Sequence, residues 1–96
     1  MAKRDDDVRN SRGMYCVMDK VATQVYPFIQ LFPTDGAAVR NMRDVVNSSG
    51  NAVSDSPSDY SLLCVGFMRD DGTIFGAEIP RVIVADVSEL LNDRSN

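Results

Sequence analysis

The segment from Gln24 to Arg40 constrains the fold of this 96-residue chain more than any other feature. An aromatic and apolar run, interrupted by Pro27, stands directly before Pro33-Thr34-Asp35. A proline followed by threonine and aspartate is typical of a helix start, because either polar side chain can accept hydrogen bonds from the first free N–H groups. The acid also suits the helix macrodipole. The segment therefore predicts a strand that leads into a helix.

Apolar residues after Asp35 recur at helical spacing, which predicts an amphipathic helix ending near Asn47. The stripe consists of Ala38, Met42, Val45 and Val46. Arg40 and Arg43 lie off this stripe, so we expect both to project away from the core. Residues 48–59 are mostly Ser, Asn, Asp, Gly and Pro, and this composition predicts a surface loop.

Five segments read as strands. Residues 14–18 and 23–29 predict a hairpin over 14–29, with Pro27 tolerated only at a sheet edge or a bulge. Residues 61–68 are apolar on both faces, which is typical of a central strand. The Asp70-Asp71-Gly72 turn then predicts a hairpin partner over 73–79. Residues 82–84 suggest a last short strand, and residues 86–91 suggest a terminal helical turn.

This order predicts an α+β fold with a mainly antiparallel β-sheet in ββ-α-ββ order and one main helix packed on one face. Residues 1–12 lack apolar periodicity and are expected to form a charged flexible arm, and residues 13–96 a single α+β domain. One helix cannot easily cover both faces of such a sheet. The other face must be solvated, paired with another subunit, or used on a ligand.

Composition narrows the classes of function. The net charge of −4 argues against strong nonspecific binding to duplex DNA, without excluding a local basic patch. No membrane-length apolar run and no signal peptide are found, so we expect a cytoplasmic protein. Cys16 and Cys64 are expected to be reduced, partly buried thiols. The absence of histidine removes Ser-His and Cys-His catalysis and most zinc sites, so neither an enzyme, a metal nor a cofactor is expected.

The remaining candidate site is aromatic and basic. Tyr15 on the first predicted strand could lie beside Tyr26 and Phe28 on the second, and such a platform is typical of single-stranded nucleic acid binding. The positive charge would come from Lys3, Arg4, Arg9, Arg12, Lys20, Arg40 and Arg43. The alternative is that Tyr26, Phe28 and Phe32 build the core under the helix, and the pattern by itself favours that alternative.

Several motifs, in order, resemble one family. They are Tyr15-Cys16-Val17-Met18-Asp19, Tyr26-Pro27-Phe28, Ala38-Val39-Arg40-Asn41-Met42, the run from Asp59 to Phe67, and Asp71-Gly72-Thr73-Ile74. Together, over about residues 14 to 76, the chain resembles the small nonstructural protein of gokushovirus-type microviruses, which are bacteriophages with circular single-stranded DNA. The resemblance implies a role in viral DNA replication in the host cytoplasm, by binding single-stranded DNA or aiding the switch to single-strand synthesis. It brings no catalytic residues.

The function expected from these observations is that of a non-enzymatic phage accessory protein that binds single-stranded DNA as a homo-oligomer. Oligomerisation would repeat a weak site and raise avidity despite the acidic charge. A protein-interaction module that binds a host or viral replication protein, without direct DNA contact, stays open as the alternative. An assembly factor that binds capsid intermediates is a third interpretation.

Overall fold

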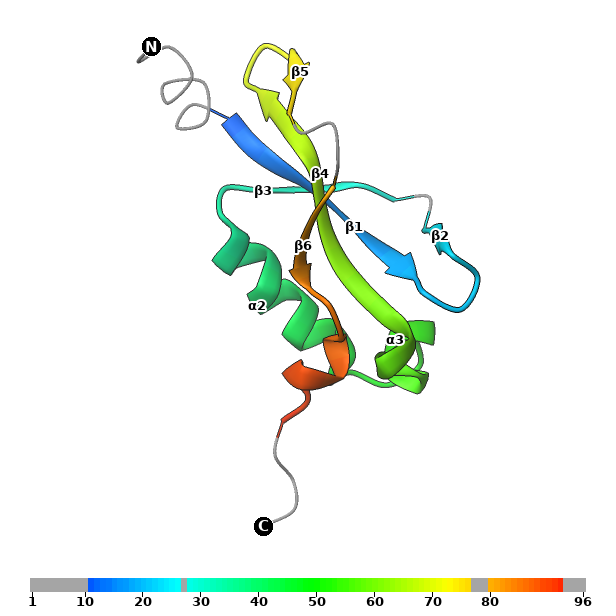
Figure 1. Ribbon diagram of the computed structural model, residues 1–96. Coiled ribbons are helices and arrows are strands. Elements are labelled where there is room, and N and C mark those ends of the chain that lie inside the picture. The colour runs from blue at the N-terminus through cyan, green and yellow to red at the C-terminus, as the bar shows by residue number, and fades with distance from the viewer. Residues whose placement is uncertain (1–10, 27, 77–79, 93–96) are drawn as a thin grey trace.

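A computed structural model describes residues 11–26, 28–76 and 80–92. Six strands form one antiparallel sheet, and the main helix lies between the third and the fourth strand. The predicted α+β fold is therefore confirmed. The sheet is built on two long strands, β1 (Ser11–Asp19) and β4 (Tyr60–Arg69), which pair over their whole length (Figure 1). Ser11 and Arg12, expected on the arm, belong to β1; the rest of the arm, residues 1–10, lies outside the described residues.

Two short strands share each outer edge of this long pair. On one side, β2 (Gln24–Val25) and β3 (Gln30–Phe32) both pair with β1. On the other side, β5 (Ile74–Phe75) and β6 (Arg81–Val84) both pair with β4. The expected strand over 23–29 was therefore wrong in extent, because the chain contacts β1 at two separate places.

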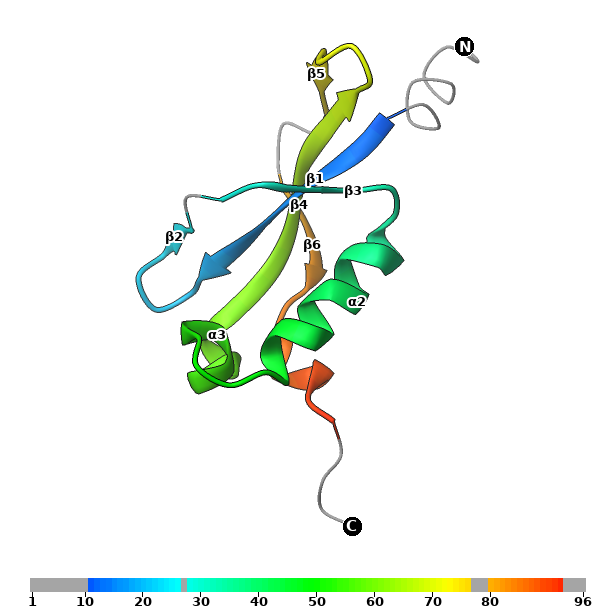
Figure 2. The same ribbon diagram turned by 180° about the vertical axis from the view of Figure 1, so that it is seen from behind.

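The helix α2 (Asp35–Val46) is the element that the sequence predicted best. The Thr34 hydroxyl accepts a hydrogen bond from the backbone N–H of Ala37 at 3.0 Å and so caps the first turn. The stripe residues Ala38, Met42 and Val46 are buried against one face of the sheet. Figure 2 shows the helix from behind, running obliquely beside β6.

The segment 48–59 is not the surface loop that its composition predicted. It holds α3 (Ala52–Asp55) and the short helix η1 (Pro57–Asp59). Val53 is 5% exposed and joins the core, while Asn51 caps α3 by accepting a hydrogen bond from the N–H of Ser54 at 2.8 Å. One buried valine and one good cap outweigh a polar composition here.

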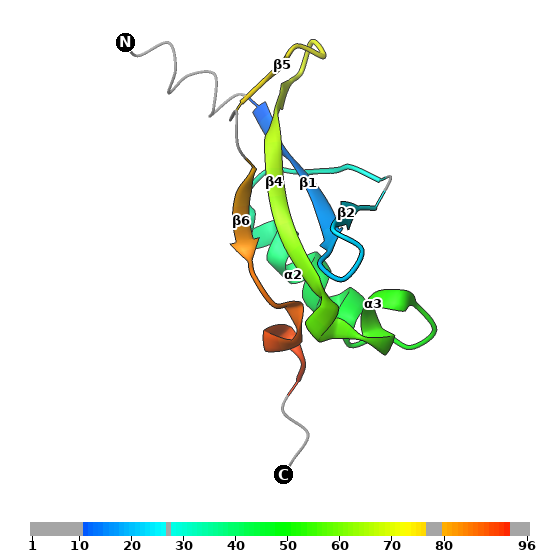
Figure 3. The ribbon, with the colours of Figure 1, turned by 45° about the vertical axis from the view of Figure 1, so that its right-hand side comes forward.

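The C-terminal part follows the prediction more closely. β6 contains the predicted strand 82–84, and η2 (Val87–Leu90) supplies the predicted helical turn. Figure 3 shows β6 alongside β4 and, after it, η2, which contacts α2. Val87 and Leu90 are buried there. The predicted hairpin partner over 73–79 is shorter than expected, since β5 ends at Phe75 and residues 77–79 are outside the described residues.

The core lies between α2 and the face of the sheet that carries Tyr15, Leu62 and Cys64. Cys16 and Leu63 are paired across β1 and β4 and belong to the opposite face, because successive side chains of a strand alternate. Both predicted thiols are free and buried, as expected. The helices in the described part of the chain pack on the Tyr15 face.

Candidate functional site: an aromatic pocket between the β2–β3 segment and α2

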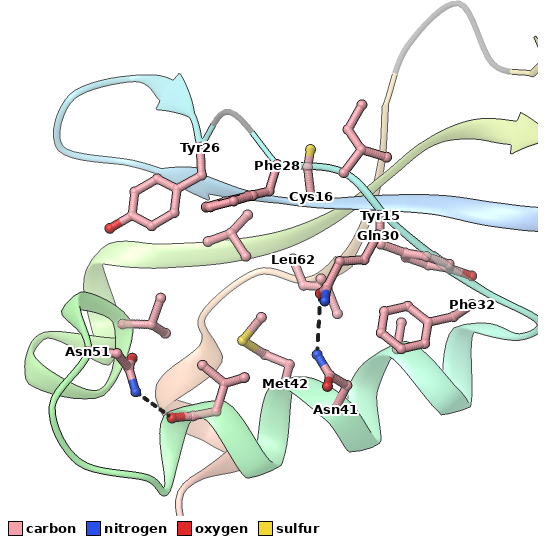
Figure 4. Close-up of a pocket in the computed structure, with 15 residues that line it drawn as sticks. Tyr15, Cys16, Tyr26, Phe28, Gln30, Phe32, Asn41, Met42, Asn51 and Leu62 are labelled. Atoms are coloured by element: carbon pink, nitrogen blue, oxygen red, sulfur yellow. Dashed lines mark hydrogen bonds between the residues drawn. The ribbon is translucent and has the colours of Figure 1, made fainter.

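A cavity of about 360 Å³ lies between α2 and the chain that runs from β2 to β3. Its walls are mostly apolar and come from β1, β4 and α2, with Val17, Met42 and Leu62 among them. The volume is at the lower end of the range of roughly 300–1,000 Å³ that is usual for small-ligand sites. We call this cavity the aromatic pocket, because Tyr15, Tyr26, Phe28 and Phe32 line it, the second and third of them from the β2–β3 segment (Figure 4).

Tyr26 and Phe28 differ in how firmly they are held. Tyr26 is half-buried; its hydroxyl lies 3.1 Å from that of Tyr60, and the rings meet edge to face at 5.6 Å. This hydrogen bond raises the pKa of Tyr60 to about 12, so its phenol stays neutral at physiological pH. Phe28 is 69% exposed, although it lines the pocket. Tyr26 is therefore a fixed wall, and Phe28 presents its ring to solvent.

The polar groups of the pocket are amides. The Asn41 side chain of α2 donates to the Gln30 Oε1 of β3 across the pocket at 3.4 Å, which is long for a hydrogen bond (Figure 4). Asn51 has a structural role, since it caps α3 and donates to the carbonyl oxygen of Val45 at 3.2 Å. The Gln30–Asn41 pair is therefore the polar feature that a ligand could most easily replace.

The structure places Tyr15 in the core and not on the surface. Its side chain is 3% exposed, its ring packs edge to face on Phe32 at 5.8 Å, and its hydroxyl donates to Asp35. Burial, together with the acceptor carboxylate, raises the pKa of Tyr15. The hydrogen bond from Tyr15, helped by Arg81, lowers the pKa of Asp35. Tyr15, expected on the aromatic platform, therefore belongs to the core and cannot stack on a base in this conformation. The core alternative holds in part for Tyr26 and Phe32, which pack against the core, and fails for Phe28, which is exposed.

The basic residues do not gather around the aromatic pocket. Arg12 begins β1 and pairs with Asp70 at 3.2 Å, and Lys20, just after β1, donates to the carbonyl oxygen of Ala85. Arg40 and Arg43 are exposed on α2, as expected. Lys3, Arg4 and Arg9 lie outside the described residues.

A second group that the sequence analysis missed combines aromatic and basic side chains on the other half of the sheet. Phe67 and Phe75 stack at 5.5 Å, with the Arg69 guanidinium 4.9 Å from the Phe75 ring and that of Arg81 5.9 Å from the Phe67 ring. Arg81 also pairs with Asp35 at 3.2 Å. The cross-strand pair Phe67–Phe75 could have been found from the β-hairpin prediction, but its arginines come from separate strands.

The described residues that line the pocket include no acid–base pair, and their polar groups are amides, phenols and the Cys16 thiol. Within the described ranges, no three His, Cys, Asp or Glu side chains come together as a metal site. No helix in that part of the chain is long and apolar enough to cross a membrane. What the pocket can do is hold a flat or apolar group against Tyr26 and Phe28 and form hydrogen bonds to its edge.

Comparison with known proteins gives one result. No curated protein and no solved structure matches the chain. A family model described as "Phage ORF5 protein" matches residues 12–90, a range that includes the whole sheet from Arg12 onward, α2 and the aromatic pocket. The chain therefore belongs to the phage ORF5 protein family.

Proposed function

We propose that this phage protein is a non-enzymatic accessory factor in viral DNA replication, and that it binds single-stranded DNA by taking one unstacked base into the aromatic pocket. The observation that carries the proposal is the pocket itself: the aromatic side chains of Tyr26 and Phe28 line a cavity of about 360 Å³ whose polar groups include the amides of Gln30 and Asn41. Membership of a phage family supports the setting.

A base suits this pocket for physical reasons. Bases of a single strand can leave the stack and lie against aromatic rings, which is worth about 1–3 kcal/mol per base. Amide side chains carry both a donor and an acceptor, so they can match the edge of a base. A bound base would replace the long bond between Asn41 and Gln30 with its own hydrogen bonds. A side pocket selects single strands, since the bases of a duplex stay stacked.

The charges support weak binding that depends on salt. The chain carries a net charge of −4, so it lacks the broad positive surface of a tight nonspecific binder. Arg40 and Arg43 are exposed on the outer side of α2, the helix that also forms a wall of the pocket. They are the candidates for phosphate contacts, and each contact to a single strand would contribute about −0.7 to the slope of log K against log salt.

Fluorescence anisotropy with labelled single- and double-stranded oligonucleotides across a salt series tests the proposal. We expect micromolar, salt-dependent binding that prefers the single strand, and about a tenfold loss of affinity for Phe28→Ala because one stacking contact is removed. Val21→Ala is the matched control, since Val21 is 75% exposed but does not line the pocket. The absence of salt-dependent binding at tens of micromolar protein would refute the proposal.

We also propose that the chain is one of the gokushovirus-type nonstructural proteins that it resembles. This assignment predicts that the protein acts in the host cytoplasm and aids the switch from duplex intermediates to single-strand synthesis. Deletion of the gene should then reduce the yield of packaged single strands while duplex replicative DNA still accumulates. Loss of both forms together would place the protein at an earlier step.

The second candidate is a protein-interaction module that binds a viral or host replication protein. It is favoured by exposed apolar side chains outside the pocket, such as Val82, which is 60% exposed. It predicts that the Arg40→Ala, Arg43→Ala double variant supports phage growth as well as the natural chain does. The DNA-binding proposal predicts reduced growth, so the double variant separates the two candidates.

A further inference from the structure

The face of the sheet opposite α2 carries exposed apolar side chains that the DNA-binding proposal does not use. Four large residues on this side are 41–60% exposed, namely Val25, Leu31, Ile74 and Val82. Scattered exposed apolar residues are normal on a protein surface, but a contiguous group of them marks an interaction site. The strand register shows that these residues form one such group.

On the β1 side, the register places apolar residues next to each other. Leu31 and Val25 are the cross-strand partners of Met14 and Met18. Met14, Cys16 and Met18 alternate along β1, so they share one face. In Figure 4, Cys16 points away from α2, which identifies this face as the one that the helix does not cover.

The same face continues across β4. Leu63 is the partner of Cys16 on one side and of Val82 on the other. Further along, Met68 pairs with Ile74. The exposed residues therefore flank a buried central row in which Cys16 and Leu63 are each 5% exposed. We call this continuous surface the open face.

We propose that the open face is the interface of a symmetric homodimer, in which two copies of the chain pack sheet against sheet. This goes beyond the proposed DNA binding, which uses the opposite side of the sheet and α2. A two-fold axis places the same surface on both partners, so the surface must complement itself. An apolar sheet face meets this condition, as the two layers of a β-sandwich do at a spacing of about 10 Å.

The size of the open face fits a dimer. β1 has nine residues and β4 has ten, and at about 3.3 Å per residue each is roughly 30 Å long. Four strand positions at about 4.8 Å make it roughly 15–19 Å wide, so its projected area is on the order of 500 Å². The accessible area of a corrugated surface exceeds its projection, which brings it toward the roughly 800 Å² per partner of a standard interface.

The distribution of charge favours a second copy as the partner. Each chain has a net charge of −4, so two copies repel one another unless they meet through a surface free of carboxylates. Of the strand-paired positions on the open face, the one that carries a charge is Arg12, near one end of β1. Its guanidinium already forms an ion pair with Asp70 of the β4–β5 turn. The open face therefore lets two acidic chains approach without bringing acids together.

Sedimentation equilibrium of the full chain from about 5 to 500 µM tests the proposal, with Val82→Glu and Leu31→Glu as variants. We expect a dimer for the natural chain and at least about 30-fold weaker association for each variant, because each places a carboxylate in an apolar interface. Val21→Glu is the matched control: it makes the same change at a 75% exposed valine in the turn after β1, and it should leave the dimer intact.

Circular dichroism and thermal unfolding of each variant show whether the fold is kept. A natural chain that is monomeric at about 500 µM overturns the proposal without any variant, and would assign the open face to a different partner. A dimer that survives both substitutions overturns it as well, as does a dimer that Val21→Glu disrupts equally. None of these results depends on DNA, so failure of this inference and failure of DNA binding are separate outcomes.

Discussion

Tyr15 in β1 and Tyr26, directly after β2, are the same residue type, yet they have different roles. Tyr15 is buried beneath α2 and donates to Asp35, the first residue of that helix. Tyr26 lines the aromatic pocket and reaches Tyr60. The difference arises because Tyr15 is in a long central strand and packs in the core at the start of α2, whereas Tyr26 follows an edge strand and lines the pocket.

The bond from Tyr15 to Asp35 should contribute to stability in a pH-dependent way. Asp35 has a lowered pKa in the folded chain, so its contribution is fully present above the unfolded value of about 3.9 and is lost as pH falls through the folded value. Since the carboxylate is 46% exposed, we expect Tyr15→Phe to cost about 1–2 kcal/mol at pH 7, below the full range for a charged hydrogen bond. The cost should shrink below about pH 4.

Urea unfolding from pH 7 to pH 2 measures this effect. Tyr26→Phe is the control, because it removes a hydrogen bond between two tyrosine hydroxyls and leaves the bond to Asp35 in place. If the free energy of unfolding falls with pH in the same way for the natural chain and for Tyr15→Phe, the bond to Asp35 does not contribute to stability.

At the scale of elements, the contact between β4 and the end of β5 depends on two glycines. Gly76 has a φ of 151°, and a Cβ there would lie 2.6 Å from the Cα of Gly66. A Cβ on Gly66 would in turn lie 3.1 Å from the carbonyl oxygen of Phe75. The backbones therefore approach so closely that a side chain at either position would push the two strands apart.

Gly76→Ala should therefore destabilise the protein by more than about 2 kcal/mol, as a backbone clash adds to backbone strain. Gly72→Ala in the same hairpin is the control, since Gly72 has a φ of 91° but no atom within 4 Å of an added Cβ. It should cost only about 1 kcal/mol from strain. Equal losses for the two variants, measured by urea unfolding, would show that the close approach of the strands is unimportant.

The elements with local signals were predicted well, and those that depend on distant contacts were not. The cap at Thr34 and the apolar stripe lie within α2 itself, so the sequence predicted its bounds. The second predicted strand is split into β2 and β3 because these segments pair with two separate parts of β1. The helix α3 forms because Val53 reaches a core that is built by other segments.

At the scale of the whole molecule, the two cysteines lie on opposite faces of the sheet, so the reactivity of each thiol measures how accessible its face is. Cys64 is 1% exposed on the face covered by α2, while Cys16 is 5% exposed on the open face. Burial also raises the pKa of the Cys16 thiol, which slows its reaction in the folded state. Access to Cys64 requires that α2 leave the sheet, whereas access to Cys16 requires only that side chains of the open face separate.

We therefore expect iodoacetamide to modify Cys16 through local openings, at a rate that depends weakly on urea, and Cys64 only through global unfolding. Peptide mass spectrometry after labelling at increasing urea, with dilute protein, gives both rates. If Cys64 reacts as fast as Cys16 in the absence of urea, α2 does not close its face of the sheet as the structure indicates.

Local sequence determined α2, the central strand β4 and the α+β class, because caps, turn residues and periodicity act between neighbours in the chain. It also identified Tyr26 and Phe28 as candidates. Only the tertiary structure decided that Tyr15 belongs to the core, and that Gln30 and Asn41 meet across the aromatic pocket. A period of two residues separates the faces of a strand but does not tell which face the helix will cover. That choice depends on packing between segments far apart in the chain.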